Sequence, residues 1–313
     1  MKTRLLLCWL CLSLISITPA MTEERCALWV DLYFGEPVEY EEVVDDLAKA
    51  DVIYLGEIHR LTRHHELQEQ IVSSLAERGK KVLLGLEQME QFNQEHLERF
   101  NQGEITFEEL AEKTNWHERW SNYKDYQPVI EQTIQSGGRV LALNARAEVI
   151  RTVGRVGLEE LPQSEREQLP EKIDLGNKLY EKWLNMQLMV HMPFSEEMLW
   201  KVYQAQVARD ETMAENLAQA WRQLQQPEEW IGVVICGGVH CAYGLGVPSR
   251  LQRRLPETSS RIIMMSESGD SEMTEAEKAM AREVTITHED MRFMQQPLGD
   301  YLHVIEQNPE TDN

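Results

Sequence analysis

Four short runs of apolar residues, well separated along the chain, constrain its fold more than any other feature of the sequence. Continuous apolar stretches of this length are typical of strands buried on both faces, as in a parallel sheet covered by helices on either side. The predicted strands cover residues 51–55, 81–86, 139–143 and 230–236. We therefore predict an α/β fold: a mostly parallel sheet flanked by helices, with an inserted helical lobe or lid.

A polar or ionisable side chain follows each of these runs, at the point where the strand should end. Glu57 and His59 follow the first run, and His240 follows the last. Because open α/β sheets bind their ligands outside the carboxyl ends of the strands, these side chains should meet at one edge of the sheet. The predicted site residues at the strand ends are Glu57, His59, Glu87, Gln88, Asn144, Arg146 and His240.

Helices are expected between and after the strands. The apolar spacing predicts a helix over residues 61–78, stopped by Gly79, and a long helix over 195–224. Two largely helical stretches, 94–135 and 178–225, are predicted to form the lid. They interrupt the series of strands, which is the pattern of one domain with an inserted lobe.

The domain limits follow from length and from the composition of the two ends. Residues 21–306 are predicted to form a single domain, because a mature chain of about 290 residues suits one core with an inserted lobe. Further strands are predicted over 261–265 and 283–287, and the tail 307–313 is expected to be disordered.

Methionine and tryptophan are concentrated in residues 178–203. Both side chains are large and adaptable, so the segment could form an apolar wall facing a flat ligand or a partner. It could equally be the packed core between the lid helices. The sequence leaves both interpretations open.

The first 20 residues have the pattern of a cleavable secretory signal peptide. Lys2 and Arg4 precede the apolar run 5–17, and the segment closes on Ala20. The run is about 13 residues long, short of the roughly 20 that span a bilayer. Neither Cys11 nor Cys26 follows the small residue that lipoprotein processing requires. We therefore expect an exported protein, periplasmic or secreted, with no transmembrane anchor in the mature chain.

Charge and cysteine content exclude two classes of protein. The formal charge is −22, from 31 basic and 53 acidic residues, which argues against nucleic acid as a partner because phosphate binding depends on Lys and Arg. Cleavage would leave only Cys26, Cys236 and Cys241, too few for a disulfide scaffold. A pair between Cys26 and Cys241 stays open.

Histidines and carboxylates near the strand ends suggest three kinds of site. They could hold a divalent metal ion, act as acid and base, or line a polar pocket. His64 and His65 open the predicted helix after His59. Adjacent residues point about 100° apart on a helix, so His64 and His65 cannot readily bind one ion. The spacing does not decide among the three alternatives.

Several of these residues recur in motifs that resemble those of the ChaN-like family of bacterial haem-binding uptake proteins. The resemblance covers about residues 45–255 and rests on motifs in the same order along the chain. The motifs are Gly56-Glu57-Ile58-His59, His64-His65-x-x-Gln68, Leu86-Glu87-Gln88, Tyr126-x-Pro128, Leu143-Asn144-Ala145-Arg146, Gln206-x-x-x-Asp210-x-x-Met213-Ala214 and Gly237-Gly238-Val239-His240 through Gly246-Val247-Pro248. Many members of the family are lipoproteins, whereas this chain has no suitably placed lipobox.

The resemblance implies an exported haem-binding protein of a haem or iron uptake system, with a pocket completed by dimerisation and two haems face to face. Its partners would be haem, a second copy of the chain and an outer-membrane haem receptor. The family implies a tyrosine ligand to the iron with histidine nearby, and an anionic phenolate suits ferric iron. Tyr126 is the expected iron ligand. The wider set of expected haem-binding residues is Tyr126, Tyr123, His59, His64, His65, Asn144, Arg146, His240 and Tyr243.

A metal-dependent hydrolase, a protease or esterase, is the alternative function. The resemblance extends to Tiki-type proteases and erythromycin esterases, which use a Glu and His pair near the same strand end. Under this hypothesis Glu57, His59, Glu87 and His240 would serve as general base, as metal ligands, or as both.

Overall fold

The computed structural model describes residues 27–191, 195–268 and 286–306. The predicted signal peptide, Cys26, most of the strand predicted at 283–287 and the predicted tail lie outside these residues. Within them, the chain forms an eight-stranded sheet in the order β2-β1-β8-β7-β3-β6-β4-β5. The strands are β1 Ala27–Asp31, β2 Glu36–Pro37, β3 Val52–Glu57, β4 Lys81–Glu90, β5 Arg139–Asn144, β6 Trp230–Gly237, β7 Ser260–Ser268 and β8 Tyr301–Glu306.

The predicted α/β fold with a mostly parallel sheet is confirmed. The strands from β8 to β5 all pair in parallel, and β1 pairs antiparallel with both of its neighbours, β2 and β8. The four apolar runs are the central and edge strands β3, β6, β4 and β5. β6 lies between β3 and β4, so the two strands that are consecutive in the sequence are not hydrogen-bonded neighbours.

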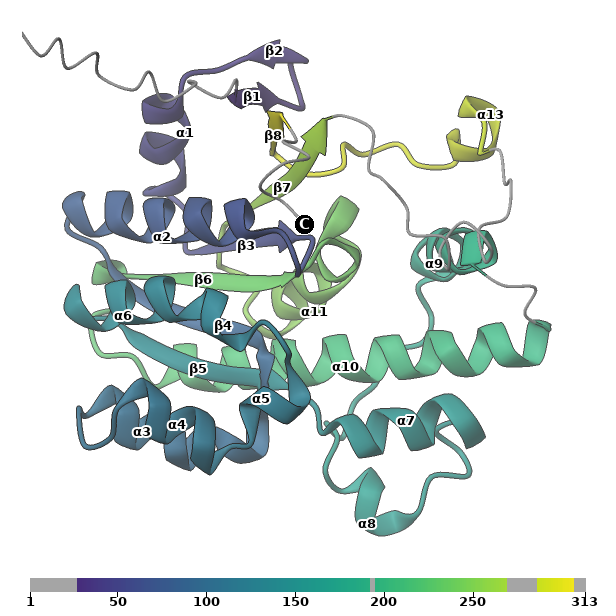
Figure 1. Ribbon diagram of the computed structural model, residues 1–313. Helices are drawn as coiled ribbons and strands as arrows, with labels where there is room; N and C mark the ends of the chain where they lie inside the picture. The colour runs from purple at the N-terminus through teal and green to yellow at the C-terminus, as the bar shows by residue number, and fades with distance from the viewer. Residues whose placement is uncertain (1–26, 192–194, 269–285, 307–313) are drawn as a thin grey trace, which may run out of the picture.

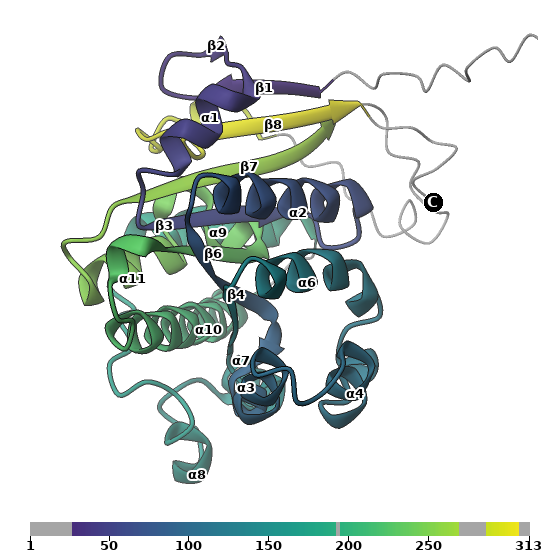
Figure 2. The same ribbon diagram turned by 90° about the vertical axis from the view of Figure 1, so that its left-hand side faces the viewer.

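Helices cover both faces of the sheet, as Figure 2 shows, with α2 and α6 on one side and α10 and α11 on the other. Alternate residues of each strand face the two layers of helices. Ile53 packs in the core on the α2 and α6 side, and Tyr54 packs in the core on the α10 and α11 side.

The helices are α1 Tyr40–Leu47, α2 Thr62–Glu77, α3 Gln94–Asn101, α4 Phe107–Lys113, α5 Trp116–Arg119, α6 Gln127–Gln135, α7 Ala147–Val156, α8 Gln163–Arg166, α9 Lys178–His191, α10 Glu196–Arg222, α11 Val247–Arg254 and α13 His288–Met291.

The lobe of the molecule lies beyond the carboxyl ends of the strands. Figure 1 shows α7, α8, α9 and the first half of α10 on that side, while the second half of α10 runs under the sheet. The aromatic residues Tyr180, Trp183 and Tyr203 form the core between α9 and α10. Trp183 is buried, whereas Met198 is about half exposed, so the Met- and Trp-rich segment contributes to both core and surface.

The segment 94–135 forms four helices and one short 3-10 helix, and its last helix, α6, packs on the sheet beside α2. Its first helix protects the open edge of β5. Asn101 accepts from the N–H of Val140 and donates to its carbonyl, at 2.9 and 3.0 Å, and Gln94 accepts from the N–H of Ala142 at 2.8 Å. These side chains occupy the hydrogen-bonding groups that an exposed edge strand would offer to another chain.

Candidate functional site at the strand ends

Two buried clusters of carboxylates and imidazoles lie at the carboxyl ends of β3, β4 and β6. Glu57 is the last residue of β3, and its register partner on β6 is Gly237. β4 runs on to Glu90, beyond the predicted end at Leu86, so Glu87 lies inside the strand. Glu57, Glu87 and His240 are each at least nine-tenths buried. The structure therefore brings these three side chains to one edge of the sheet, as the sequence predicts.

Glu57 is the centre of the first cluster. Its Oε1 accepts from the Tyr126 hydroxyl at 2.5 Å, from His59 Nδ1 at 2.7 Å and from Gln88 Nε2 at 2.9 Å. Its Oε2 accepts from Gln68 Nε2 at 2.5 Å. Burial disfavours the carboxylate, but the hydrogen bonds from His59 and His65 outweigh burial and hold the pKa of Glu57 well below its usual range. Glu57 is thus a buried anion satisfied on every side.

His240 is the centre of the second cluster. Its Nδ1 lies 2.5 Å from Asp210 Oδ1, and its Nε2 lies 3.1 Å from Glu87 Oε1. Asp210 also accepts from the Tyr180 hydroxyl at 2.6 Å, and Glu87 Oε2 accepts from the N–H of Gly237 at 2.7 Å. These contacts join α9, α10, β4 and β6 around one imidazole.

Electrostatics keep His240 charged at neutral pH. Burial opposes protonation, but the negative charges of Glu87 and Asp210 outweigh it and raise the pKa of His240 to about 10. Burial likewise opposes ionisation of Glu87, yet the charge of His240 lowers the pKa of that carboxyl to about 2. The cluster is therefore an imidazolium between two carboxylates, and its His240 has no free electron pair for a metal ion or a substrate proton at neutral pH.

His59 is the part of the two clusters that reaches the surface. Its side chain is 33 % exposed, while its Nδ1 is bonded to the buried Glu57. The ring of Trp120 packs edge-on against it, 4.8 Å between centroids. A Cβ at Gly237 would lie 2.9 Å from His59 Nε2, so a glycine is needed for the imidazole to lie this close to the backbone. Within the described residues, Nε2 makes no hydrogen bond.

Two residues of the strand-end motifs carry exposed apolar side chains. Ile58 is 52 % exposed and Val239 is 38 % exposed, although both belong to the strand-end motifs. We call the surface formed by Ile58, His59 and Val239 the strand-tip face. The strand-tip face thus combines a partly exposed imidazole with two exposed apolar side chains.

His64 and His65 point to different partners, as adjacent helix positions require. His65 faces Glu57, with Nε2 3.5 Å from Oε2. His64 Nδ1 accepts from the N–H of Ile58 at 3.0 Å. Burial lowers the pKa of His64 to about 4, so this histidine is neutral and shapes the turn that carries Ile58 and His59. Neither imidazole reaches the strand-tip face.

The three tyrosines that sequence analysis selected have different surroundings. Tyr126 is fully buried and donates to Glu57; burial and the negative charge of Glu57 raise its pKa far above the usual value. Tyr123 is partly buried and stacks on Phe107, 6.1 Å between centroids. Tyr243 lies at a φ of +57° and packs against Trp183 of α9. In this arrangement the Tyr126 oxygen is occupied by Glu57 and does not face a ligand.

Asn144 and Arg146, at the end of β5, differ in their relation to the clusters. Asn144 is buried and donates to the carbonyl of Glu87 at 2.8 Å, so it supports the second cluster. The Arg146 guanidinium lies over the ring of Phe92, 4.9 Å from its centroid, and pairs with Glu148. Arg146 therefore belongs to a separate surface, and the structure does not join it to the strand-tip histidines.

Asp210, Gln206 and Tyr180 complete the second cluster, although the sequence alone assigns none of them a role. Gln206 Nε2 lies 3.0 Å from His240 Nδ1. Asp210 and Gln206 are spaced i, i+4 and hence lie on one face of α10. Asp210 is fully buried on this face. A polar residue within the apolar stripe of the predicted helix is the pattern that could have indicated it.

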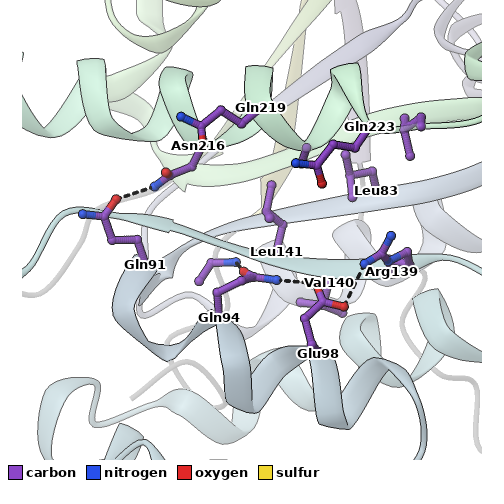
Figure 3. Close-up of a pocket in the computed structure, with 13 residues that line it drawn as sticks. Leu83, Gln91, Gln94, Glu98, Arg139, Val140, Leu141, Asn216, Gln219 and Gln223 are labelled. Atoms are coloured by element: carbon purple, nitrogen blue, oxygen red, sulfur yellow. Dashed lines mark hydrogen bonds and ion pairs between the residues drawn. The ribbon is translucent and has the colours of Figure 1, made fainter. Parts of the chain in front are cut away.

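The described residues contain no group of three or more His, Cys, Asp or Glu side chains arranged to hold a metal ion. A hollow between β5, α3 and α10, shown in Figure 3, lies away from the strand tips and has a volume of about 180 Å³. That is below the roughly 300–1,000 Å³ of small-molecule sites, and side chains such as Gln91 and Asn216 pair with each other across it.

In the part of the chain that the structure describes, no helix has the length and apolar character needed to cross a membrane.

Comparison with known proteins gives a family match and several relatives. The family model for haem-binding uptake proteins, Tiki superfamily, ChaN, matches residues 43–251. The structure titled "Cofacial heme binding to ChaN of Campylobacter jejuni" has a TM-score of 0.65 and 20 % identity, covering 91 % of this chain and 98 % of that one. An erythromycin esterase mutant in its open conformation has a TM-score of 0.44 and 14 % identity, covering 76 % and 77 %.

A curated relative comes from a plant. Protein RETICULATA-RELATED 5, chloroplastic, of Arabidopsis thaliana is 26 % identical over 253 residues, which are 74 % of this chain and 34 % of that protein. The chain thus spans about a third of the length of this relative.

Proposed function

Because this chain belongs to the ChaN family of haem-binding uptake proteins in the Tiki superfamily, we propose that it is exported and binds haem in a bacterial haem or iron uptake system. The haem lies on the strand-tip face, and a second copy of the chain covers its other side. The observation that carries the proposal is His59: its Nδ1 is bonded to buried Glu57, and its imidazole is partly exposed at the end of β3, where Ile58 and Val239 are exposed as well.

The surroundings of His59 are those of a histidine prepared to bind a metal. A ligating imidazole usually donates its other N–H to a carboxylate, which fixes the ring and strengthens the ligand. Glu57 provides this contact at 2.7 Å. If haem binds here, His59 would be the residue that ligates its iron, through Nε2. Burial opposes protonation of His59, but the bond to Glu57 and the nearby charge of Glu87 outweigh it and raise the pKa of His59, so protons would compete with iron for Nε2.

Tyr126 has a supporting role in this proposal, which differs from the iron ligand that the family resemblance implies. Its hydroxyl holds Glu57 Oε1, the oxygen that also accepts from His59. Loss of Tyr126 would therefore change the orientation and basicity of His59 without removing a ligand. Ligation by Tyr126 would require breaking its bond to Glu57 and leaving a buried carboxylate one donor short.

The dimer follows from the shape of the proposed site. The strand-tip face covers one side of a porphyrin at most, since His59, Ile58 and Val239 lie on a single surface. The other side of the ligand would face water in a single copy. A second copy related by a two-fold axis would bring an identical face and a second haem.

The hydrolase alternative is less well supported by the same geometry. A general base works best with a pKa near the operating pH. Glu57 and Glu87 have pKa values well below that range, and His240 is an imidazolium between two carboxylates. The buried groups pair with other side chains of the two clusters. Of the four residues proposed for a hydrolase, His59 is therefore the one with an accessible side chain.

Titration of the purified chain with hemin, followed by the Soret band, tests the assignment. We expect saturable binding that His59→Ala weakens at least about tenfold and with a changed Soret position, since a ligand is removed. Tyr126→Phe should weaken binding but keep the Soret position, because the ligand stays. His288→Ala and Tyr33→Phe are the matched controls, since both side chains are exposed.

Two outcomes would contradict the assignment. A Soret position that moves in Tyr126→Phe and not in His59→Ala would make the tyrosine the ligand. Absence of saturable hemin binding to the unmodified chain would refute haem binding itself. Sedimentation of the hemin-loaded chain should also give a dimer that Val239→Asp disrupts, since a charge would then be buried in the proposed interface.

A further inference from the structure

Three sulfur atoms converge on the α10 and α11 side of the sheet, below the strand tips. In the register of the sheet, Gly56 of β3 lies between Cys236 of β6 and Met264 of β7. The three residues form one row across neighbouring strands. Cys241 follows His240 in the turn after β6 and closes over this row. The sulfur cluster, as we call Cys236, Cys241 and Met264, therefore combines two strands and a turn.

Gly56 makes the room for these side chains. A Cβ at Gly56 would lie 2.7 Å from Cys241 Sγ and 2.9 Å from Met264 Sδ, closer than atoms can approach. Both sulfur atoms thus lie directly over the Gly56 backbone. They are 3.8 Å apart. Cys236 is the neighbour of Gly56 in the sheet register, and Cys241 is near enough to raise the pKa of the Cys236 thiol. Metal–sulfur bonds of about 2.3 Å in a trigonal arrangement would place the sulfur atoms about 4 Å apart.

Tyr54 adds an independent indication of a missing ligand. It precedes Gly56 by two residues on β3, so its side chain lies on the same sheet face as the cluster. Its hydroxyl is fully buried and has no hydrogen-bond partner among the described residues. Both cysteines are close enough to act electrostatically on this hydroxyl. An unsatisfied buried donor is rare, whereas a thiolate formed at Cys236 or Cys241 would accept its hydrogen bond.

We propose that Cys236, Cys241 and Met264 form a binding site for Cu(I). Thiolate and thioether ligands together select soft ions, and Cu(I) is the common soft ion that a thioether ligates. Binding releases one proton from each thiol, so the site changes from neutral to a single negative charge, with Tyr54 donating to a thiolate. No electron is transferred. Met264 is partly exposed and its methyl group lies against Gly238, which gives the ion a path from the strand tips.

Competition with a chromophoric Cu(I) chelator tests this site, with the chain fully reduced and free of oxygen. We expect the chain to retain one equivalent of Cu(I). Cys241→Ser should weaken binding at least about a hundredfold and Met264→Leu about tenfold, since even outer partners of a metal are worth 10–100-fold. Met265→Leu is the matched control, because this residue is next in β7 but packs in the opposite core.

The variants also distinguish loss of the copper site from loss of folding. Met264→Leu conserves volume, so it should fold even if Cys241→Ser does not. The proposal is wrong if Cu(I) does not bind stoichiometrically, or if Met264→Leu and Met265→Leu bind it equally. It is also wrong if both thiols of the Cu(I)-treated chain react with a thiol reagent as fast as those of the untreated chain, since ligating thiolates would be protected. X-ray absorption should show sulfur ligands alone around the ion. Because hemin is absent, the result is independent of the proposed haem function.

Discussion

Substituting His240 by alanine should lower the free energy of unfolding by about 3–5 kcal/mol, the usual cost of removing one partner from a buried ion pair. The imidazolium lies between Glu87 and Asp210, at 3.1 and 2.5 Å. Without it, two buried carboxylates face each other with no positive charge between them. Both are nearly fully removed from solvent, so water cannot readily replace the lost interactions. Urea denaturation of the variant beside the unmodified chain measures the effect.

The same residue predicts how stability depends on pH. The pKa of His240 is raised to about 10 in the folded chain, against about 6.5 for an unperturbed histidine. A raised pKa means that the stabilisation is complete below pH 6.5 and is lost progressively as the pH rises to about 10. The unmodified chain should therefore lose stability over this interval, and His240→Ala should lose much less. His288→Ala, at an exposed position, should behave like the unmodified chain. Equal pH profiles for all three proteins would show that His240 is not charged in the folded state.

Gly246→Ala should be more severe still, with a loss of more than about 4 kcal/mol or no folded protein. A Cβ at Gly246 would lie 2.0 Å from the carbonyl oxygen of His240 and 2.6 Å from its carbonyl carbon. The obstacle is backbone, so a change of rotamer cannot relieve it. The turn from Gly238 to Gly246 would have to open, and His240 would move away from Glu87 and Asp210. Circular dichroism and thermal unfolding of the variant measure the loss.

Gly154→Ala is the matched control for this substitution. In α7 a Cβ at Gly154 would meet only Ala205, at an ordinary contact distance of 3.8 Å. Alanine in a helix interior is favoured over glycine by about 0.5–1 kcal/mol, so this variant should be as stable as the unmodified chain or slightly more so. If Gly246→Ala unfolds at the same temperature as Gly154→Ala, the turn at His240 is more compliant than its packing indicates.

Local features of the sequence predicted the elements of the sheet well. The four apolar runs are strands β3, β4, β5 and β6, and a long helix does begin after Ser195, whose side chain accepts from the N–H of Met198. These outcomes depend on hydrophobic periodicity and end signals within a few residues of each element. The strand ends also brought Glu57, Glu87 and His240 together, because parallel strands place their carboxyl ends on one side.

Residues distant in sequence decided the chemical state of the site. Asp210 and Tyr180 come from α10 and α9, and their contacts with His240 depend on how the lobe packs against the sheet. Tyr126 was expected to bind iron, but its contact with Glu57 depends on how the turn before α6 docks beside α2. The sequence shows which side chains could take part in the site, but it does not show which of them contact one another in the folded chain.

The sequence by itself determined the strands, the polar ends of those strands and the membership of a haem-binding family, because each is encoded in short stretches of residues. Only the tertiary structure decided that β6 lies between β3 and β4. That single placement sets Gly237 beside Glu57 and Cys236 beside Gly56, and so creates both the exposed His59 and the sulfur cluster. Strand order is chosen by the packing of whole layers, which sums many weak contacts between distant residues and leaves no local pattern in the chain.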